Sequence, residues 1–192
     1  MKALDTLPTD YKQIFKVNLQ KDKKIAMLNS IGAAIIFVAM AVIMNMYIPI
    51  STMFSNPEKL VPYIARFLTL AVGMYAYIIL HELTHGIVIK MVGSSSVHYG
   101  FTGLYAYAGS DSYFNKKAYL TIALAPIVLW GIVLAALNML VPVEWFWVVY
   151  IIQIGNISGG TGDLYVTWKF SKMPDDNLVH DSGIEMEVYS AK

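Results

Sequence analysis

The residues best suited to chemistry in this chain are the five that read His81-Glu82-Leu83-Thr84-His85. An H-E-x-x-H pattern on a helix places two imidazoles four residues apart on one face, about one turn from each other, where both can bind a single zinc ion. The glutamate follows the first histidine directly, where its carboxylate can reach a water bound to that metal. The pattern therefore predicts a zinc site with His81 and His85 as ligands and Glu82 beside the water.

A catalytic zinc site also needs a third protein ligand and leaves its fourth position to water. The extended pattern with another histidine six residues after the second is absent, because that position holds Met91. The candidates that remain lie outside the motif, and they are Asp163, Asp111, Glu144, His98 and His180. Their positions relative to the membrane distinguish them.

The composition places most of the chain in a membrane. Of its 192 residues 57% are apolar and 14% charged, and its mean hydropathy of +0.54 is well above that of a soluble domain. Four apolar runs, 25–48, 62–92, 118–141 and 145–168, are each long enough for the roughly 20 residues of a transmembrane helix. We therefore expect an all-α integral membrane protein with about four transmembrane helices. A net charge of +1 gives no case for a nucleic-acid partner, and the absence of Cys excludes disulfides and thiolate ligands.

The positive charges predict the orientation, because Lys and Arg in short loops stay on the cytoplasmic side. With the amino terminus inside, the inner segments hold Lys2, Lys12, Lys16, Lys21, Lys23, Lys24, Lys90, Lys116, Lys117, Lys169, Lys172 and Lys192. Only Lys59 and Arg66 are left near the outer face. We expect a multi-pass protein of the cell membrane with both termini in the cytoplasm.

This orientation divides the chain into three parts. Residues 1–24 form a basic cytoplasmic or interfacial segment, either a short helix from near Pro8 and Thr9 or a solvated tail. Residues 25–170 form the four-span membrane domain with the zinc site. Residues 171–192 form a cytoplasmic polar tail, in which Ile184 to Tyr189 either forms a strand or is disordered.

Helix geometry brings Asp163 to the depth of the two histidines. His81 and His85 come 19 and 23 residues after Pro62, or roughly 28 to 35 Å along the second run at 1.5 Å per residue. Asp163 comes 18 residues after Trp145, or roughly 27 Å along a run in the same direction. The other candidates fall at the opposite face, in the polar tail or in the polar connection between spans. We therefore expect Asp163 to be the third ligand.

The stretch around Asp163 is rich in small residues, which let helices approach closely in lipid. Asn156 lies seven residues before Asp163, two helical turns back on the same face. One interpretation is that it donates a hydrogen bond to a substrate carbonyl or a developing oxyanion. The other is that it pairs with a neighbouring helix.

Two further features bear on the site. Pro126, inside the third run, has no N–H and so frees a backbone carbonyl, which a neighbouring helix or side chain must satisfy. The polar connection at 93–113 is rich in Gly, Ser and Tyr, with alternation through Tyr99 and Phe101 before a turn and the stretch Leu104 to Ala108. This alternation predicts a β-hairpin.

The four short spans, the H-E-x-x-H at the end of the second and the late intramembrane aspartate resemble the intramembrane zinc metalloproteases of the site-2 protease type. The similarity is greatest to the small bacterial membrane proteins catalogued as putative zincin peptidases, and it covers roughly residues 60–190. The resemblance implies His81, His85 and Asp163 as ligands, Glu82 as catalytic acid and base, and Asn156 as a substrate-positioning group. It also implies a hairpin at residues 97–108 that dips toward the site.

These features predict an intramembrane zinc metallopeptidase, with Zn²⁺ as cofactor and a membrane protein or peptide in the lipid bilayer as substrate. A zinc-activated water attacks the peptide carbonyl while Glu82 takes its proton and passes it to the leaving amine. The main alternative is a zinc-binding membrane scaffold or regulator without proteolysis. A metal or proton transporter with a relay through the same residues is a further alternative, although groups clustered at one level do not form a pathway.

Overall fold

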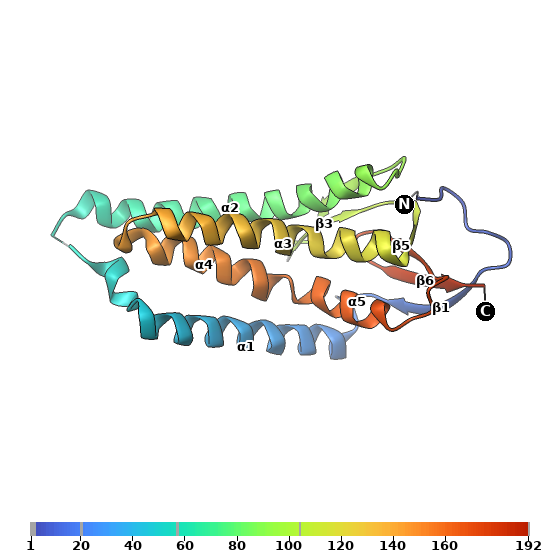
Figure 1. The fold of residues 1–192 in the computed structure, drawn as a ribbon, viewed down its shortest axis with the longest axis horizontal. Coiled ribbons are helices and arrows are strands. Elements are labelled where there is room, and N and C mark those ends of the chain that lie inside the picture. Colours follow the sequence, from blue (N-terminus) through green and yellow to red (C-terminus); the bar gives the residue numbers. More distant parts are fainter. Residues whose placement is uncertain (1–2, 20, 57, 104, 192) are drawn as a thin grey trace. The chain divides into compact units, whose positions relative to one another are not determined.

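The computed structural model of the chain describes residues 3–19, 21–56, 58–103 and 105–191 (Figure 1). Lys2, Leu104 and Lys192, which entered the predictions above, lie outside the described residues. The chain divides into two compact units, each of which is described by itself. The sheet unit comprises Met1–Asn29, Leu80–Pro126 and Gly162–Lys192, and the helical unit comprises Ser30–Ile79 and Ile127–Thr161.

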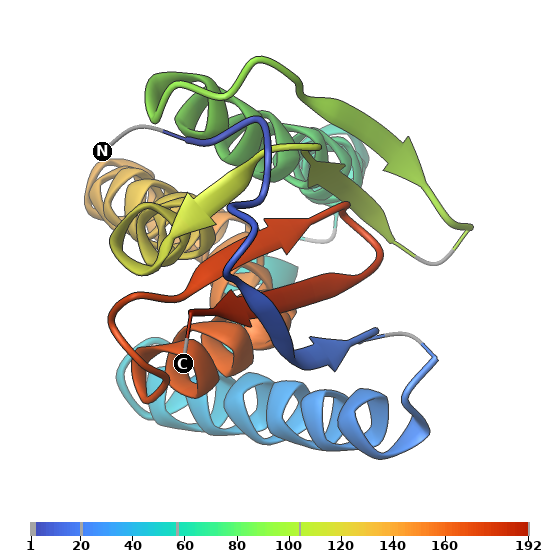
Figure 2. The same cartoon turned by 90° about the vertical axis from the view of Figure 1, so that its right-hand side faces the viewer.

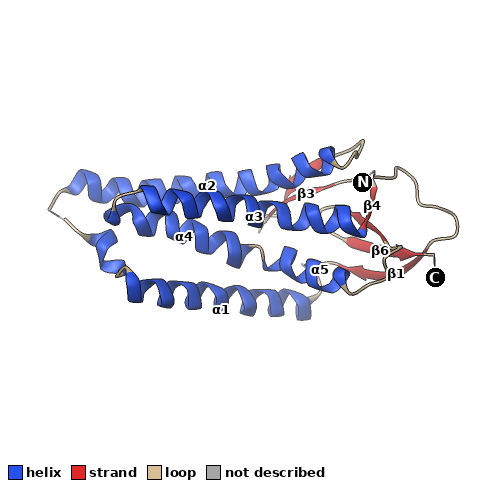
Figure 3. Ribbon diagram, in the orientation of Figure 1, coloured by secondary structure: helices blue, strands red, loops and turns tan. Residues whose placement is uncertain are grey.

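Three helices in the described part of the chain are long and apolar enough to cross a membrane (Figure 3). They are α1 (Lys23–Tyr47), α2 (Leu60–Met91) and α3 (Lys116–Leu140), and they match the first three apolar runs. The fourth run is divided at Gly160 into α4 (Val143–Gly159) and α5 (Thr161–Ser171). A Cβ at residue 160 would lie 2.6 Å from the Ile127 side chain of α3, so a larger residue there would force that side chain to shift.

The helical unit is built from parts of α1, α2 and α3 together with α4 and the short helix η1 (Ile50–Phe54). Its core gathers around Trp147, which is 1% exposed and donates a hydrogen bond from Nε1 to the Ile48 carbonyl at 3.0 Å. Arg66 is buried and donates to the carbonyls of Ser55 and Thr52. The Thr52 carbonyl also accepts the backbone N–H of Ser55, so Arg66 adds donors to carbonyls at the end of η1.

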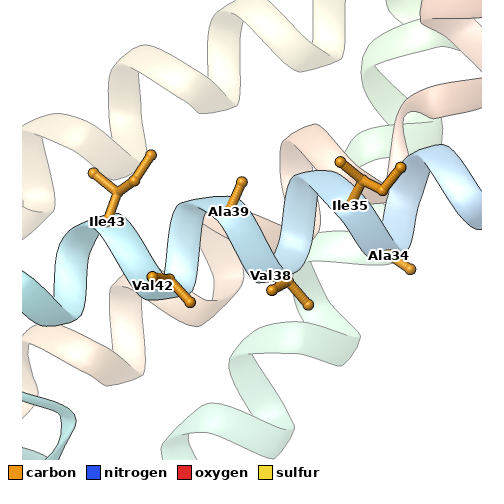
Figure 4. Close-up of a pocket in the computed structure, with 6 residues that line it drawn as sticks. All are labelled: Ala34, Ile35, Val38, Ala39, Val42 and Ile43. Carbon is orange, nitrogen blue, oxygen red and sulfur yellow. The ribbon is translucent and has the colours of Figure 1, made fainter.

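The surface of α1 in this unit is apolar. A shallow groove on it is lined by residues of α1 alone, spaced four apart in two rows (Figure 4): Ala34, Ile35, Val38, Ala39, Val42 and Ile43. In water such a surface would be unfavourable, and a helix that is apolar around its circumference is typical of contact with lipid.

The sheet unit contains a four-stranded antiparallel sheet in the order β1-β6-β5-β4 (Figure 2). Its strands are β1 (Lys12–Val17), β4 (Tyr113–Asn115), β5 (Leu178–Asp181) and β6 (Met186–Ser190). Val179 pairs with Val188 on one side and with Phe114 on the other. All three side chains are at most 1% exposed and pack with Ile122 of α3 and Phe170 of α5 in one core.

The sheet corrects the expectation of an all-α fold, since the structure is mostly helical but has small sheets among its described residues. The amino-terminal segment forms β1 rather than the helix or solvated tail that we expected. The alternating stretch near the carboxyl terminus forms β6, so the strand alternative was correct. The predicted hairpin is present as β2 (His98–Phe101) and β3 (Ala106–Gly109).

Candidate metal centre

The structure brings together the three residues that we predicted as metal ligands. His81 and His85 lie near the end of α2, and Asp163 lies in the first turn of α5, all within the sheet unit. The Nε2 atom of His81 is 3.3 Å from one Asp163 oxygen, and the Nε2 atom of His85 is 3.6 Å from the other. Because the histidines are four residues apart on α2, their ring centroids are only 4.9 Å apart.

The donor set fits zinc. One potential ligand atom from each of the three residues lies within 4.8 Å of the others, and this is the one such group found in the described residues. Two imidazole nitrogens and a carboxylate oxygen are ligands that zinc accepts in catalytic sites. The side chains are 13%, 11% and 23% exposed in the order His81, His85 and Asp163, so all three are largely sheltered from solvent.

The second nitrogen of His85 is held by the backbone of α3. Its Nδ1 atom lies 2.9 Å from the carbonyl oxygen of Ile122, which can only accept, so Nδ1 is the donor. The lone pair of the neutral ring is therefore on Nε2, the atom that faces Asp163. Pro126 explains why this carbonyl is available, because the N–H that would reach Ile122 in a regular helix is missing.

The predicted hairpin lies against α2 beside the motif. The backbone N–H of Ala108 in β3 lies near the Glu82 carboxylate. The ring of Tyr99 in β2 covers α2 at Gly86, where an added Cβ would collide with the phenol. The absence of a side chain at Gly86 thus allows the hairpin to approach the helix beside Glu82.

A second acid near the site escaped the sequence analysis. The Asp181 carboxylate, at the end of β5, accepts hydrogen bonds from the hydroxyl of Tyr119 at 2.7 Å and the N–H of Gly183 at 2.8 Å. Burial raises the pKa of Asp181 above its ordinary value, and the two hydrogen bonds oppose that rise. No local pattern marks Asp181, because only the pairing of β5 with β4 brings it to α3.

The other third-ligand candidates lie apart from this group. His98 Nε2 lies 2.7 Å from an Asp111 oxygen, and this contact lowers the pKa of Asp111 below its usual range. His180 Nδ1 lies 3.7 Å from a Glu187 oxygen. Glu144 lies in the first turn of α4, in the helical unit. These four side chains are not part of the group formed with His81 and His85.

Asn156 is fully buried in the helical unit, and both ends of its amide are engaged. Its oxygen accepts from the Tyr77 hydroxyl at 2.9 Å, and its nitrogen donates to the Ile127 carbonyl at 3.0 Å. Asn156 therefore makes the pairing between helices that was one of its two interpretations. A role toward substrate stays a prediction.

Comparison with known proteins supports a zinc peptidase relationship. The chain is 32% identical over 123 residues to a 24.7 kDa protein of Pyrococcus woesei, described as an uncharacterized protein in the gap 5′ region. That match covers 62% of this chain and 53% of the relative, so the chain spans about half the length of the curated relative it matches. No solved structure matches the chain. The model of the family described as "putative zincin peptidase" matches residues 74–178, a range that includes both histidines, Glu82 and Asp163. This match covers more than half of the chain, which therefore belongs to that family.

Proposed function

We propose that this protein is an intramembrane zinc metallopeptidase of the site-2 protease type, which hydrolyses peptide bonds of membrane proteins. The observation that carries the proposal is the cluster of His81, His85 and Asp163. Its two histidines and Glu82 lie on α2, a helix long enough to cross a membrane. The membership of the zincin peptidase family supports the same chemistry.

The proposed topology has both termini in the cytoplasm. In it α1, α2 and α3 each cross the membrane, and α4 with α5 makes the fourth crossing despite the break at Gly160. The site then lies toward the cytoplasmic side, where water can reach it. The basic segment 1–24 and the tail 171–192 are cytoplasmic in this arrangement, and their strands β1, β5 and β6 form the sheet beside the site.

His81, His85 and Asp163 would hold the zinc, and when bound it supplies the Lewis acidity that makes water a nucleophile at neutral pH. Glu82 takes the proton of the attacking water on its carboxylate and gives it to the leaving amine. The Ala108 N–H, which lies near the Glu82 carboxylate, is proposed to orient it toward the water.

The hairpin suits the capture of an unwound substrate segment. A helical substrate keeps its carbonyls in internal hydrogen bonds, so a stretch of it must unwind before a carbonyl reaches the site. In the described part of the chain β2 pairs with β3 alone, and its side chains Tyr99 and Phe101 are 51% and 70% exposed. An extended substrate strand is proposed to pair with the outer edge of β2.

Zinc content and cleavage, measured together, test this function. Glu82→Gln is expected to bind zinc as the wild type does and to lose cleavage of membrane-protein fragments, whereas His85→Ala and Asp163→Ala are expected to lose the metal. Glu144→Gln, the same change in the first turn of α4, is the matched control and should keep both properties. Full zinc occupancy in both ligand variants would refute the metal site, and a zinc-loaded wild type that leaves every membrane substrate intact would favour the scaffold alternative.

A further inference from the structure

A proline in the middle of α3 stands one turn after a carbonyl that a metal-ligand histidine uses. Pro126 has no N–H, so the Ile122 carbonyl four residues earlier has no partner within its own helix. A proline ring also crowds the carbonyl at that position and tilts it out of the helix. In a membrane helix such a carbonyl needs a donor from a neighbouring element, because lipid offers none.

The donor is the imidazole of His85. Its Nδ1 lies 2.9 Å from the Ile122 oxygen, and Ile122 and His85 are only 5% and 8% exposed. Water is therefore a poor competitor at this contact. Because the carbonyl cannot donate, the hydrogen bond selects the neutral tautomer with its proton on Nδ1 and leaves the Nε2 lone pair directed to the side of Asp163.

We propose that Pro126 is a positioning residue for the metal site, which acts by reserving the Ile122 carbonyl for His85. This inference rests on the metal site proposed above. With an ordinary residue at position 126, the helical N–H would take the carbonyl along the helix axis, and His85 would have to share an oxygen directed away from it. The proline removes that competitor, so the ring of His85 is held in the orientation and tautomer that a ligand needs before any metal arrives. Hydrogen bonds of this kind raise the affinity of metal sites about 10- to 100-fold.

The test is Pro126→Ala, with Pro62→Ala as the matched control. Both variants replace a proline in a helix by alanine, but Pro62 lies in the first turn of α2, where a missing N–H costs no internal hydrogen bond. Zinc affinity is measured on purified protein by competition with a chelator. The dissociation constant of Pro126→Ala is expected to rise at least tenfold, and that of Pro62→Ala to stay within twofold of the wild type.

A second measurement needs neither metal nor activity. The chain has four histidines, so an ¹⁵N-histidine NMR spectrum of the metal-free wild type is simple enough to assign with single His→Asn variants. The neutral ring of His85 is expected to carry its proton on Nδ1. The tautomer of His85 in the wild type also tests the proposed hydrogen bond to the Ile122 carbonyl if Pro126→Ala fails to fold.

Two results would overturn the proposal: a proton on Nε2 of neutral His85 in the metal-free protein, or a folded Pro126→Ala whose zinc affinity equals that of the wild type. A wild type that binds no zinc would instead refute the proposed function, which separates the two failures.

Discussion

Replacing Gly86 by alanine should separate metal binding from the placement of the hairpin. A Cβ at residue 86 would lie 2.9 Å from Cε1 of Tyr99 and closer still to the phenol carbon and oxygen. Carbon atoms in contact are normally about 3.5 to 4.0 Å apart. The ring of Tyr99 must therefore move away from α2.

The expected magnitudes show which measurement is informative. Alanine in place of glycine stabilises a helix by about 0.5–1 kcal/mol, whereas overpacking costs about 1–3 kcal/mol. Tyr99 is half exposed and can move outward, so the cost of overpacking should be near 1 kcal/mol. The gain in helix propensity then nearly cancels this cost in the free energy of unfolding. The local effect is larger where the hairpin follows the ring, because β3 then carries the Ala108 N–H away from the Glu82 carboxylate, and a hydrogen bond to a charged group contributes about 1.5–3 kcal/mol. That loss corresponds to roughly a 10- to 100-fold slower reaction.

The assay compares four proteins: wild type, Gly86→Ala, Tyr99→Ala and the double variant. Gly86→Ala should bind zinc normally, lose cleavage and expose the hairpin to limited proteolysis. Removal of the ring relieves the collision, so the double variant should lose less than the two single effects combined. Gly32→Ala in α1 is the control for helix propensity, since its Cβ would meet a neighbour at an ordinary 3.9 Å. Equal proteolysis of the hairpin in Gly86→Ala and wild type, with additive effects in the double variant, would refute this reasoning.

Three further predictions concern residues outside the metal group. Asn156→Ala should lower the free energy of unfolding by about 2 kcal/mol, because it removes two buried hydrogen bonds, one of them from Tyr77. Its zinc affinity should stay unchanged. Denaturation measures the stability and chelator competition the affinity, and weaker zinc binding with unchanged stability would contradict the structural role. The hydrogen bond from Tyr189 lowers the pKa of Glu187 in the folded protein, which means that the ionised carboxylate stabilises the fold. This stabilisation is present above the ordinary glutamate pKa and is lost as the pH falls below about 4. The melting temperature of Glu187→Gln should accordingly lie below that of the wild type at pH 7 and converge with it at pH 3, and a constant difference would contradict this. Asn177 is 1% exposed, and its side-chain amide has no hydrogen-bond partner among the described residues. An unpaired buried amide costs about 1–3 kcal/mol, so Asn177→Leu should raise the melting temperature. A lower melting temperature would show that the amide has a hydrogen-bond partner in the folded protein.

The proximity of the two histidines was predictable because it depends on a rule that acts within one helix. The spacing of His81 and His85 is a property of α2 alone, and it brings the rings together whatever surrounds them. Asp163 was selected by rise along a continuous helix, yet the chain divides at Gly160. The structure places the two Asp163 oxygens beside the imidazoles of His81 and His85, and the role of Asp163 as third ligand stays a prediction.

The sheet could not be predicted in the same way. In the segment that forms β1, the apolar residues Tyr11, Ile14, Phe15 and Leu19 repeat at helical spacing, which favoured a helix. The pairing of β1 with β6 overrides that spacing, and it joins Lys12 to Ser190 and Lys16 to Glu187. Side-chain ion pairs from Lys16 to Glu185 and Glu187 follow from the register. Partners so far apart in sequence leave no periodic mark on either strand.

Pro126 shows where local and long-range rules meet. The sequence predicts that a helix with proline at 126 has an unpaired carbonyl at 122, and lipid around that helix would make a donor necessary. It does not identify the donor, because that depends on how α2 and α3 pack. The structure supplies His85, the same residue that the H-E-x-x-H pattern marks as a ligand. A histidine with both ring nitrogens engaged loses one interaction if it rotates to improve the other, so the carbonyl and the metal group together restrict its orientation more than either does alone.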